Sequence, residues 1–323
     1  MNHLLTCMGE ILIDFLPIEE HGTTLGFRMH PGGAPFNVAV GLARLGMPVA
    51  FLSKMADDFF GRYLRRYLEQ QGVRPDFVLL EQRGLTTLAF VAIEGGEPVY
   101  TFYNNGTADT LMQIDEFPSA VFAETRILHC VGSVSLLGGS TPQAVIATAE
   151  RLKGQALISF DPNIRANMAH DEAQYRALVG QMMGLADLVK VSAADLAWLM
   201  PGQTDAQIAS AILGRGVSLL VITQGRHGVT AFAPNPGGPP VQLHVPAFPI
   251  TVADTVGAGD AFSSGLLAAL AERNIITATA LYQLPIAELE QALRFASAVA
   301  AITTTRAGSN PPTRAEVEQF LAG

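Results

Sequence analysis

The sequence is short of charged residues, of cysteine and of long apolar runs, and each shortage excludes a class of protein. Only 15% of the 323 residues are charged whereas 49% are hydrophobic, which is typical of a globular chain and not of a disordered one. Two cysteines, Cys7 and Cys130, are too few for a disulfide framework or a zinc site. No uninterrupted apolar run reaches the length of a membrane span. We expect a globular protein with two reduced cysteines in its core.

Basic residues are also scarce, since 20 Lys and Arg stand against 29 Asp and Glu, for a formal net charge of −9. Such a chain has no general attraction for nucleic acid or an anionic membrane, so we expect neither as a partner. Any phosphate site must therefore be local, built from backbone N–H groups, single basic residues and a metal. The first residues, MNHLLTCMGEILIDF, lack the basic segment of a signal peptide, and we expect a cytoplasmic protein.

Short apolar runs alternate with amphipathic stretches along the chain, which is the pattern of an α/β sheet. The predicted central strands are residues 4–8, 49–53, 77–80, 127–131, 156–160, 188–191 and 219–223. The predicted helices are residues 35–45, 59–71, 142–153, 171–183, 205–214, 258–272 and 288–303. These helices are long enough to serve as crossovers between parallel strands.

Two stretches, residues 10–30 and 86–104, instead alternate apolar with polar residues and contain Gly-rich turns. Alternation suits a sheet with one wet face, so these stretches predict a small appended sheet, with a hairpin turning at Gly95 and Gly96. Residues 233–244, APNPGGPPVQLH, predict a surface hairpin loop. Neither an internal repeat nor a convincing linker is present, which favours one domain.

The strongest local signal is DTVGAGD at residues 254–260, a turn of small residues that leads directly into a predicted helix. Glycine lets the backbone approach a ligand, and the free N–H groups of a helix start attract an anion. Asp260 beside this cradle is either a proton acceptor for phosphoryl transfer or an acidic residue that complements the helix dipole. The chain lacks GxxxxGK[ST] and GxGxxG, which disfavours a P-loop and a dinucleotide-dependent oxidoreductase.

A second glycine cluster, HPGGAPFN at residues 30–37, also precedes a predicted helix. Gly32 and Gly33 allow close approach to a ligand, and Asn37 can both donate and accept hydrogen bonds. The same residues also suit a plain helix start with Pro35 in the first turn. This cluster by itself does not decide between the two interpretations.

Together, the two glycine clusters resemble the signatures of the PfkB (ribokinase-like) family of carbohydrate kinases. GGAPFNVA at residues 32–39 is similar to the N-terminal signature of that family, and DTVGAGDAF at residues 254–262 to its C-terminal one. The resemblance covers essentially the whole chain, residues 1–323. It implies a three-layer α/β/α sandwich with a mostly parallel central sheet, and a small β-sheet lid formed by about residues 10–30 and 86–104. It also implies transfer of the γ-phosphoryl group of ATP to a sugar hydroxyl.

The resemblance assigns roles to individual residues of this chain. Its implied catalytic residues are Asp260 as the base, the N–H groups of Gly257, Ala258 and Gly259 as an anion hole, and Arg165 as a charge clamp. Its implied sugar contacts are Asp14, Gly32, Gly33, Asn37, Asn105, Asp109 and Asn163. Its implied nucleotide contacts are Ser192, Asp195, Thr223, Gly225, Gly228, Thr255, Gly257 and Gly259.

Ions and a partner subunit are implied as well. Ser192 and Asp195 stand where the family has an Asn-x-x-Glu element that positions Mg²⁺, so Asp195 is the expected indirect Mg²⁺ ligand. Asp254 and the loop at residues 303–309 are the expected surroundings of a monovalent cation, K⁺. The lid of that family often doubles as a dimer clasp, which implies a homodimer through the lid sheet.

The fructokinase branch is the part of the family that this chain resembles, through SFDPNIR at residues 159–165, TTLAFVAI at 86–93 and YTFYNNGTAD at 100–109. These residues place Asp161, Asn163 and Arg165 at a strand end. Asn104 stands where fructokinase-like sequences often carry Arg. Fructose is the expected acceptor, with 2-keto-3-deoxygluconate, ribose and a nucleoside as alternatives. A catalytically silent sugar-sensing protein is the alternative from another class.

Overall fold

The computed structural model describes residues 3–20, 23–94 and 97–323, and its centre is one nine-stranded sheet. In spatial order the strands are β13 (Val241–Val245), β12 (Val229–Ala233), β11 (Leu219–Thr223), β10 (Leu188–Ser192), β9 (Leu157–Asp161), β8 (Thr125–Val131), β1 (Leu4–Met8), β4 (Val49–Ala56) and β5 (Val78–Glu81). The strands from β11 to β5 pair in parallel, whereas β12 and β13 add an antiparallel hairpin at one edge.

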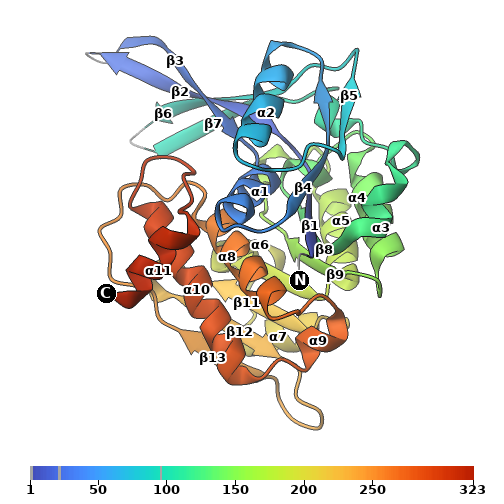
Figure 1. The fold of residues 1–323 in the computed structure, drawn as a ribbon, viewed down its shortest axis with the longest axis vertical. Coiled ribbons are helices and arrows are strands. Elements are labelled where there is room, and N and C mark those ends of the chain that lie inside the picture. Colours follow the sequence, from blue (N-terminus) through green and yellow to red (C-terminus); the bar gives the residue numbers. More distant parts are fainter. Residues whose placement is uncertain (1–2, 21–22, 95–96) are drawn as a thin grey trace.

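Helices cover both faces of this sheet, so the body is the three-layer α/β/α sandwich that the sequence predicts (Figure 1). One face packs against α1 (Ala34–Arg44), α2 (Phe59–Gln70), α8 (Ala258–Glu272), α9 (Ala278–Tyr282), α10 (Ile286–Thr304) and α11 (Arg314–Ala322). The other face packs against α3 (Ser119–Glu124), α4 (Thr141–Leu152), α5 (Glu172–Leu185), α6 (Ala193–Leu199) and α7 (Asp205–Leu213). Strand residues alternate between the two cores because successive side chains point to opposite faces.

A second, four-stranded sheet lies beside this body and is called the lid sheet below (Figure 1). Its spatial order is β3 (Thr23–Gly32), β2 (Leu12–Glu20), β6 (Thr87–Glu94) and β7 (Glu97–Tyr103). The Phe15 ring stacks on Phe90 with centroids 4.7 Å apart, and Phe60 of α2 meets Phe15 edge to face at 5.8 Å. Aromatic contacts therefore join the lid sheet to the body.

The chain runs from β1 to β4 on one side, while β8 pairs with β1 on the other. In an open parallel sheet such a reversal of strand order is a topological switch point, and ligands bind beyond the carboxyl ends of the strands there. The segments that follow β1, β8 and β9 therefore border the predicted ligand site.

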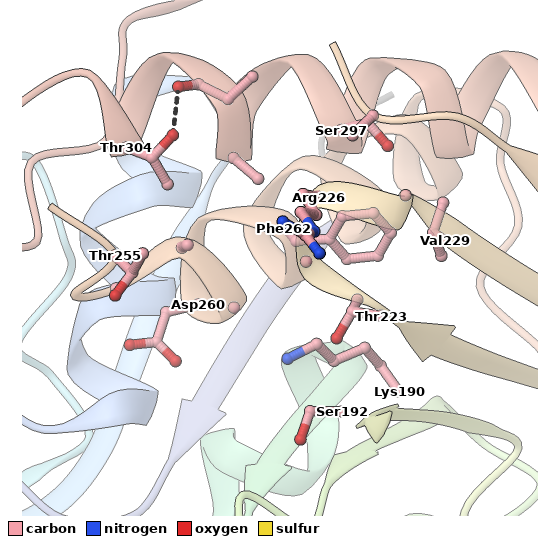
Figure 2. Close-up of a pocket in the computed structure, with 18 of the residues that line it drawn as sticks. Lys190, Ser192, Thr223, Arg226, Val229, Thr255, Asp260, Phe262, Ser297 and Thr304 are labelled. Atoms are coloured by element: carbon pink, nitrogen blue, oxygen red, sulfur yellow. Dashed lines mark hydrogen bonds between the residues drawn. The ribbon is translucent and has the colours of Figure 1, made fainter. Parts of the chain in front are cut away.

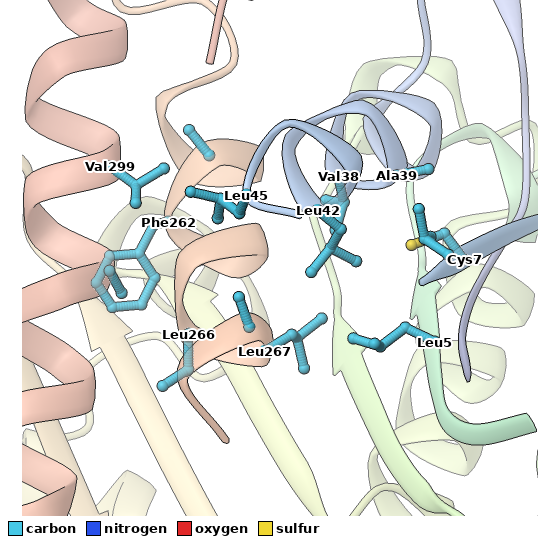
Figure 3. Packing of buried hydrophobic residues seen from close by; sticks show 14 of the residues in the cluster. Leu5, Cys7, Val38, Ala39, Leu42, Leu45, Phe262, Leu266, Leu267 and Val299 are labelled. Carbon is cyan, nitrogen blue, oxygen red and sulfur yellow. The ribbon is translucent and has the colours of Figure 1, made fainter. Parts of the chain in front are cut away.

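Helix α8 is buried along most of its length between α1 and α10 (Figure 3). Phe262, Leu266 and Leu267 belong to the same hydrophobic cluster as Val299 of α10. A Cβ atom on Gly265 would lie 2.8 Å from the Ala296 Cα atom, so glycine is required for this close approach of α8 and α10. Tight packing on both sides fixes where α8 begins.

The seven predicted central strands are confirmed, with boundaries that differ by a few residues, and residues 10–30 and 86–104 contribute the strands of the small appended sheet. The predicted helices are also present as α1, α2, α4, α5, α7, α8 and α10, and α8 has the predicted bounds. Residues 233–244 are only partly a loop, because β12 and β13 form the arms of that hairpin and extend the central sheet. The predicted turn at Gly95 and Gly96 lies outside the described residues. No described helix has the length and apolar character of a membrane span.

Candidate active site

The start of α8 faces a cavity of about 940 Å³, which lies beyond the carboxyl ends of β9, β10 and β11 (Figure 2). Gly257 is the N-cap residue and adopts a left-handed conformation with φ of 74°. A Cβ atom there would collide with Ser309, so both conformation and space require glycine. The helix has no side-chain cap of its own, which leaves its first turn free for an anion.

Asp260 is the acidic residue of this first turn, and its side chain is buried. The Asn37 amide of α1 donates a hydrogen bond of 2.8 Å to its Oδ2 atom. Burial raises the pKa of Asp260 to about 6, while the Asn37 hydrogen bond and the nearby Lys190 charge oppose that rise. A carboxylate with such a pKa is mostly ionised at neutral pH and can accept a proton.

Lys190 of β10 is a buried ammonium group on the floor of the cavity, and the sequence interpretation did not select it. Its Nζ atom donates to the Asp161 carboxylate over 2.7 Å, and both side chains are buried. A Cβ atom on Gly259 would lie 2.9 Å from the same Nζ atom, which places this charge next to the α8 turn. The sequence signal that could have identified Lys190 is a lysine inside the apolar run of residues 188–191.

The loop after β9 carries Arg165 and Asn163 into the cavity lining. Asn163 has a positive φ of 39°, which is uncommon for a residue other than glycine. Two carboxylates hold this loop: Asp161 accepts from the Asn163 N–H at 3.2 Å, and Asp195 accepts from the Ile164 N–H at 3.2 Å. Arg165 donates to the carbonyl oxygen atoms of Asn163 and Ile164 (3.4 and 3.1 Å). Residues with such backbone angles cluster at functional sites, which agrees with the place of Asn163 in the cavity lining.

The predicted nucleotide contacts all line this cavity: Ser192, Asp195, Thr223, Gly225, Gly228, Thr255, Gly257 and Gly259. Ser192 caps α6 by accepting from the Asp195 N–H at 3.0 Å. Burial, and then the charge of Asp161, raises the pKa of Asp195. The Ala258 N–H, one of the predicted anion-hole donors, itself donates to the Thr255 carbonyl oxygen at 3.2 Å.

Asp254 does not line the cavity but ties two loops together. Its carboxylate accepts from the Val256 N–H at 3.0 Å and from the Gly308 N–H at 2.8 Å. The predicted partner loop at residues 303–309 is therefore brought against the turn at 254–257.

One predicted sugar contact, Asn163, lines the cavity, and the other six fall into two groups. Asp14 lies on β2 opposite His30 of β3, and a Cβ atom on Gly32 would collide with its carboxylate. Burial raises the pKa of Asp14 to about 6. None of the four residues of this group, Asp14, Gly32, Gly33 and Asn37, lines the cavity. Gly33 is the N-cap residue of α1, and Asn37 of the same helix reaches Asp260 at the start of α8.

Asn105 and Asp109 form the second group, and neither lines the cavity. Asp109 is buried and accepts from the hydroxyls of Thr87 (2.6 Å) and Thr107 (2.8 Å). Its Oδ2 atom has no hydrogen-bond partner among the described residues, and burial raises the pKa of Asp109 to about 6. Asn105 is exposed.

The arrangement joins a helix start, a buried carboxylate that can accept a proton, and the side chains of Lys190 and Arg165 in one cavity. Phosphoryl transfer requires those parts: a cradle for phosphate, positive charge for the transition state, and a proton acceptor for the attacking hydroxyl. No three His, Cys, Asp or Glu side chains gather into a metal site within the described ranges. A metal here would therefore take most of its ligands from substrate phosphate oxygens and water.

Comparisons with known proteins agree with this chemistry. A family model described as pfkB family carbohydrate kinase matches residues 2–316. A fructokinase of Rhizobium leguminosarum bv. trifolii is 35% identical over 292 residues, which cover 90% of this chain and 86% of that protein. The crystal structure of a Xylella fastidiosa fructokinase with bound ATP matches with a TM-score of 0.91 and 29% identity, over 100% of this chain and 99% of that one. A Vibrio cholerae O395 fructokinase in its fructose, ADP and calcium ion bound form matches with a TM-score of 0.84 and 29% identity, over 99% of each chain.

Proposed function

Because the chain belongs to the pfkB family of carbohydrate kinases, we propose that it transfers the γ-phosphoryl group of ATP to a hydroxyl of fructose. The fructokinases that it resembles support fructose over 2-keto-3-deoxygluconate, ribose or a nucleoside. The observation that carries the proposal is Asp260, a buried carboxylate that borders the cavity at the start of α8 and is held by Asn37.

In the proposed reaction, Asp260 accepts the proton of the attacking hydroxyl while the γ-phosphoryl group arrives from the cavity. The α8 turn at Gly257–Gly259 holds the phosphoryl oxygens, and Lys190 and Arg165 offset the negative charge that builds on them. The residues that border the sugar in this proposal are Asp14, Gly32, Gly33, Asn37 and Asn163. Asn105 and Asp109 are retained as sugar contacts of the closed complex, in which the loop at 104–109 lies over the substrate.

Mg²⁺ is the proposed metal, and the site fits it in the manner usual for nucleotide enzymes. Mg²⁺ binds through one or two carboxylates together with substrate phosphates and water. Asp195 lines the cavity with one oxygen atom on the Ile164 N–H, and we assign it the indirect role toward Mg²⁺. Asp254 and the loop at 303–309 are the proposed surroundings of K⁺, since Asp254 already joins that loop to the α8 turn.

The lid sheet is the proposed cover of the sugar and the proposed interface of a homodimer. Its exposed apolar side chains, Ile18, Leu25, Phe27 and Tyr103, support an interface. The cytoplasm is the proposed compartment, because the reaction consumes ATP. A catalytically silent sugar-sensing protein would need a broken base or anion hole, and the intact Asp260 and glycine turn favour an enzyme.

An ATP-consumption assay against fructose, 2-keto-3-deoxygluconate, ribose and a nucleoside tests the proposal directly. Fructose should give the highest kcat/KM. Another sugar as the best acceptor would replace fructose in the assignment, and a chain that no sugar stimulates would not be a sugar kinase. ATP hydrolysis without sugar should be far slower, since closure of a lid excludes water.

A further inference from the structure

Glu10 is a buried carboxylate to which the proposed chemistry gives no role. It follows β1 at the switch point of the sheet, and only 2% of its surface is exposed. Within the part of the chain that the structure describes, no Lys, Arg or His forms an ion pair with it. Burial of an unpaired carboxylate costs several kcal/mol, so it persists only where neutral donors compensate it.

The first of these donors belongs to α1. That helix begins at Gly33, has no side-chain cap of its own and no acidic residue in its first turn. The N–H of Ala34, its first residue, donates to Glu10 Oε1 at 3.3 Å. Glu10 therefore supplies, from another element, the acceptor and the negative charge that a helix start requires.

The other donors come from the segment after β8. The hydroxyls of Ser133 and Ser135 donate to Oε1 and Oε2 of Glu10, and the Glu10 N–H donates back to Ser135 Oγ at 3.0 Å. The surrounding backbone leaves no spare room, because a Cβ atom on Gly33 would lie 2.7 Å from the Glu10 carbonyl oxygen. The Glu10 carboxylate thus joins the segments after β1 and β8 to the start of α1 through hydrogen bonds.

Asn37 lies one turn further along α1 than the contacts of Glu10. The Asn37 N–H donates to the Gly33 carbonyl oxygen at 2.9 Å, and the Asn37 amide holds Asp260 at 2.8 Å. We propose that Glu10 is a positioning residue, which fixes the first turn of α1 and through Asn37 sets the place of the catalytic Asp260. The inference rests on the proposed kinase function for its kinetic readout.

A double-mutant cycle between Glu10 and Asn37 tests it. Glu10→Ala should lower kcat for fructose roughly tenfold to a hundredfold, since misplacement of a catalytic group by about 1 Å has such effects. In the Asn37→Ala enzyme the same change should lower kcat little further, because the path through Asn37 is already broken. Glu10→Gln should restore most of the activity, since its carbonyl oxygen can still accept from Ala34. Equal losses in both backgrounds, or an unchanged kcat in Glu10→Ala, would overturn the proposal.

Asp187 provides a matched control for lost stability. It is also a buried carboxylate, which accepts from the Ile158 N–H at 2.9 Å and, unlike Glu10, pairs with the exposed Lys153 ammonium group at 3.6 Å. It precedes β10, at the opposite end of the strands. Asp187→Ala should lower the melting temperature and leave kcat unchanged when both are measured well below that temperature. A loss of kcat equal to that of Glu10→Ala would mean that any buried carboxylate has the effect, and would refute a specific role for Glu10.

Hydrogen exchange provides a readout that does not depend on activity. Amides of residue 34 and residues 36–42 should exchange faster in Glu10→Ala than in the wild type, and at the wild-type rate in Glu10→Gln. If no sugar is phosphorylated by the wild type, the proposed function fails while this comparison still decides the inference. Unchanged exchange at the start of α1 in Glu10→Ala contradicts the positioning role.

Discussion

Helices α1 and α8 both begin at a glycine and have no capping side chain of their own, but different groups face the two starts. At α1, Glu10 accepts from the Ala34 N–H, and the glycine lies against the backbone of Glu10. At α8, no carboxylate of another described element accepts from the first turn, and Gly257, Ala258 and Gly259 line the 940 Å³ cavity. The first start is closed by the protein, whereas the second is open to a ligand.

The difference shows that one sequence pattern can have two physical uses. Glycine at the α1 start allows close packing between segments of the protein, and glycine at the α8 start allows close approach of a phosphate. Asn37 and Asp260 join the two starts through one hydrogen bond, so the closed start supports the open one. Substitutions at the two helices should therefore separate stability from turnover.

The largest effect is expected at the open start, from Asp260→Asn. The variant keeps the size and polarity of the side chain but cannot accept the proton of the attacking hydroxyl. Turnover should fall by roughly 10²–10⁴, while the affinity for fructose changes little. Steady-state kinetics with ATP and fructose give both quantities. Turnover close to that of the wild type would remove Asp260 from the role of base.

Asp14→Ala tests the proposed sugar contact that lies next to Gly32, just before the start of α1. Loss of a carboxylate that accepts hydrogen bonds from sugar hydroxyls costs about 1.5–3 kcal/mol per bond, which is a rise of roughly tenfold to 150-fold in KM for fructose. The kcat should change little, because the hydroxyls are held in the ground and transition states alike. The KM for ATP should not change, because Asp14 is expected to bind only the sugar. The melting temperature at pH 7.5 should not fall, since burial already disfavours the charge of Asp14. A destabilised variant with an unaltered KM for fructose would exclude Asp14 from the site.

A pair of glycine variants tests the comparison itself. Gly33→Ala should lower the free energy of unfolding by roughly 1–3 kcal/mol, because φ is 109° there and the new methyl group meets the Glu10 carbonyl oxygen. Gly259→Ala should fold normally, because its methyl group meets only the movable end of Lys190. Its turnover should nevertheless fall by roughly tenfold to a hundredfold, through displacement of that charge. A stable Gly33→Ala together with a destabilised, fully active Gly259→Ala would contradict the distinction between the two helix starts.

The smallest effect is a pH dependence that Asn37 should shift. Since the pKa of Asp260 is about 6 and the base must be ionised, kcat should fall about tenfold per pH unit below pH 6. Asn37→Ala should move this acid limb to higher pH, because its hydrogen bond lowers the pKa. Profiles of kcat from pH 5 to 8 for both proteins provide the measurement. An unshifted limb would mean that another group controls it.

The same raised pKa gives a stability effect of opposite sign to that of most carboxylates. The folded state binds the Asp260 proton more tightly than the unfolded state, whose pKa is near 3.8. The stability that this group contributes is therefore present below pH 3.8 and is lost as the pH rises to about 6. Asp260→Asn should melt at a higher temperature than the wild type at pH 7.5, with a smaller difference at pH 5. A lower melting temperature at pH 7.5 would contradict the burial cost.

Apolar periodicity in the sequence predicted the strands and helices of the body. A strand that is buried on both faces has a continuous apolar run, which is easy to recognise. The start of α8 was predicted to the residue, since glycine turns have a strong local signature. The hairpin of β12 and β13 was predicted only as a loop. Its outer strand is largely exposed and lacks an apolar run, and pairing with β12 alone makes it a strand.

The sequence by itself determined the α/β class, the two glycine-rich helix starts and the choice of Asp260, because these depend on local periodicity and on residues a few positions apart. Only the tertiary structure decided which groups face those starts. Lys190 below Gly259, Glu10 at the start of α1 and Asn37 on Asp260 are contacts between segments far apart in the chain. Such contacts depend on how helices and strands pack, and packing places side chains together through a three-dimensional geometry that a local pattern does not contain.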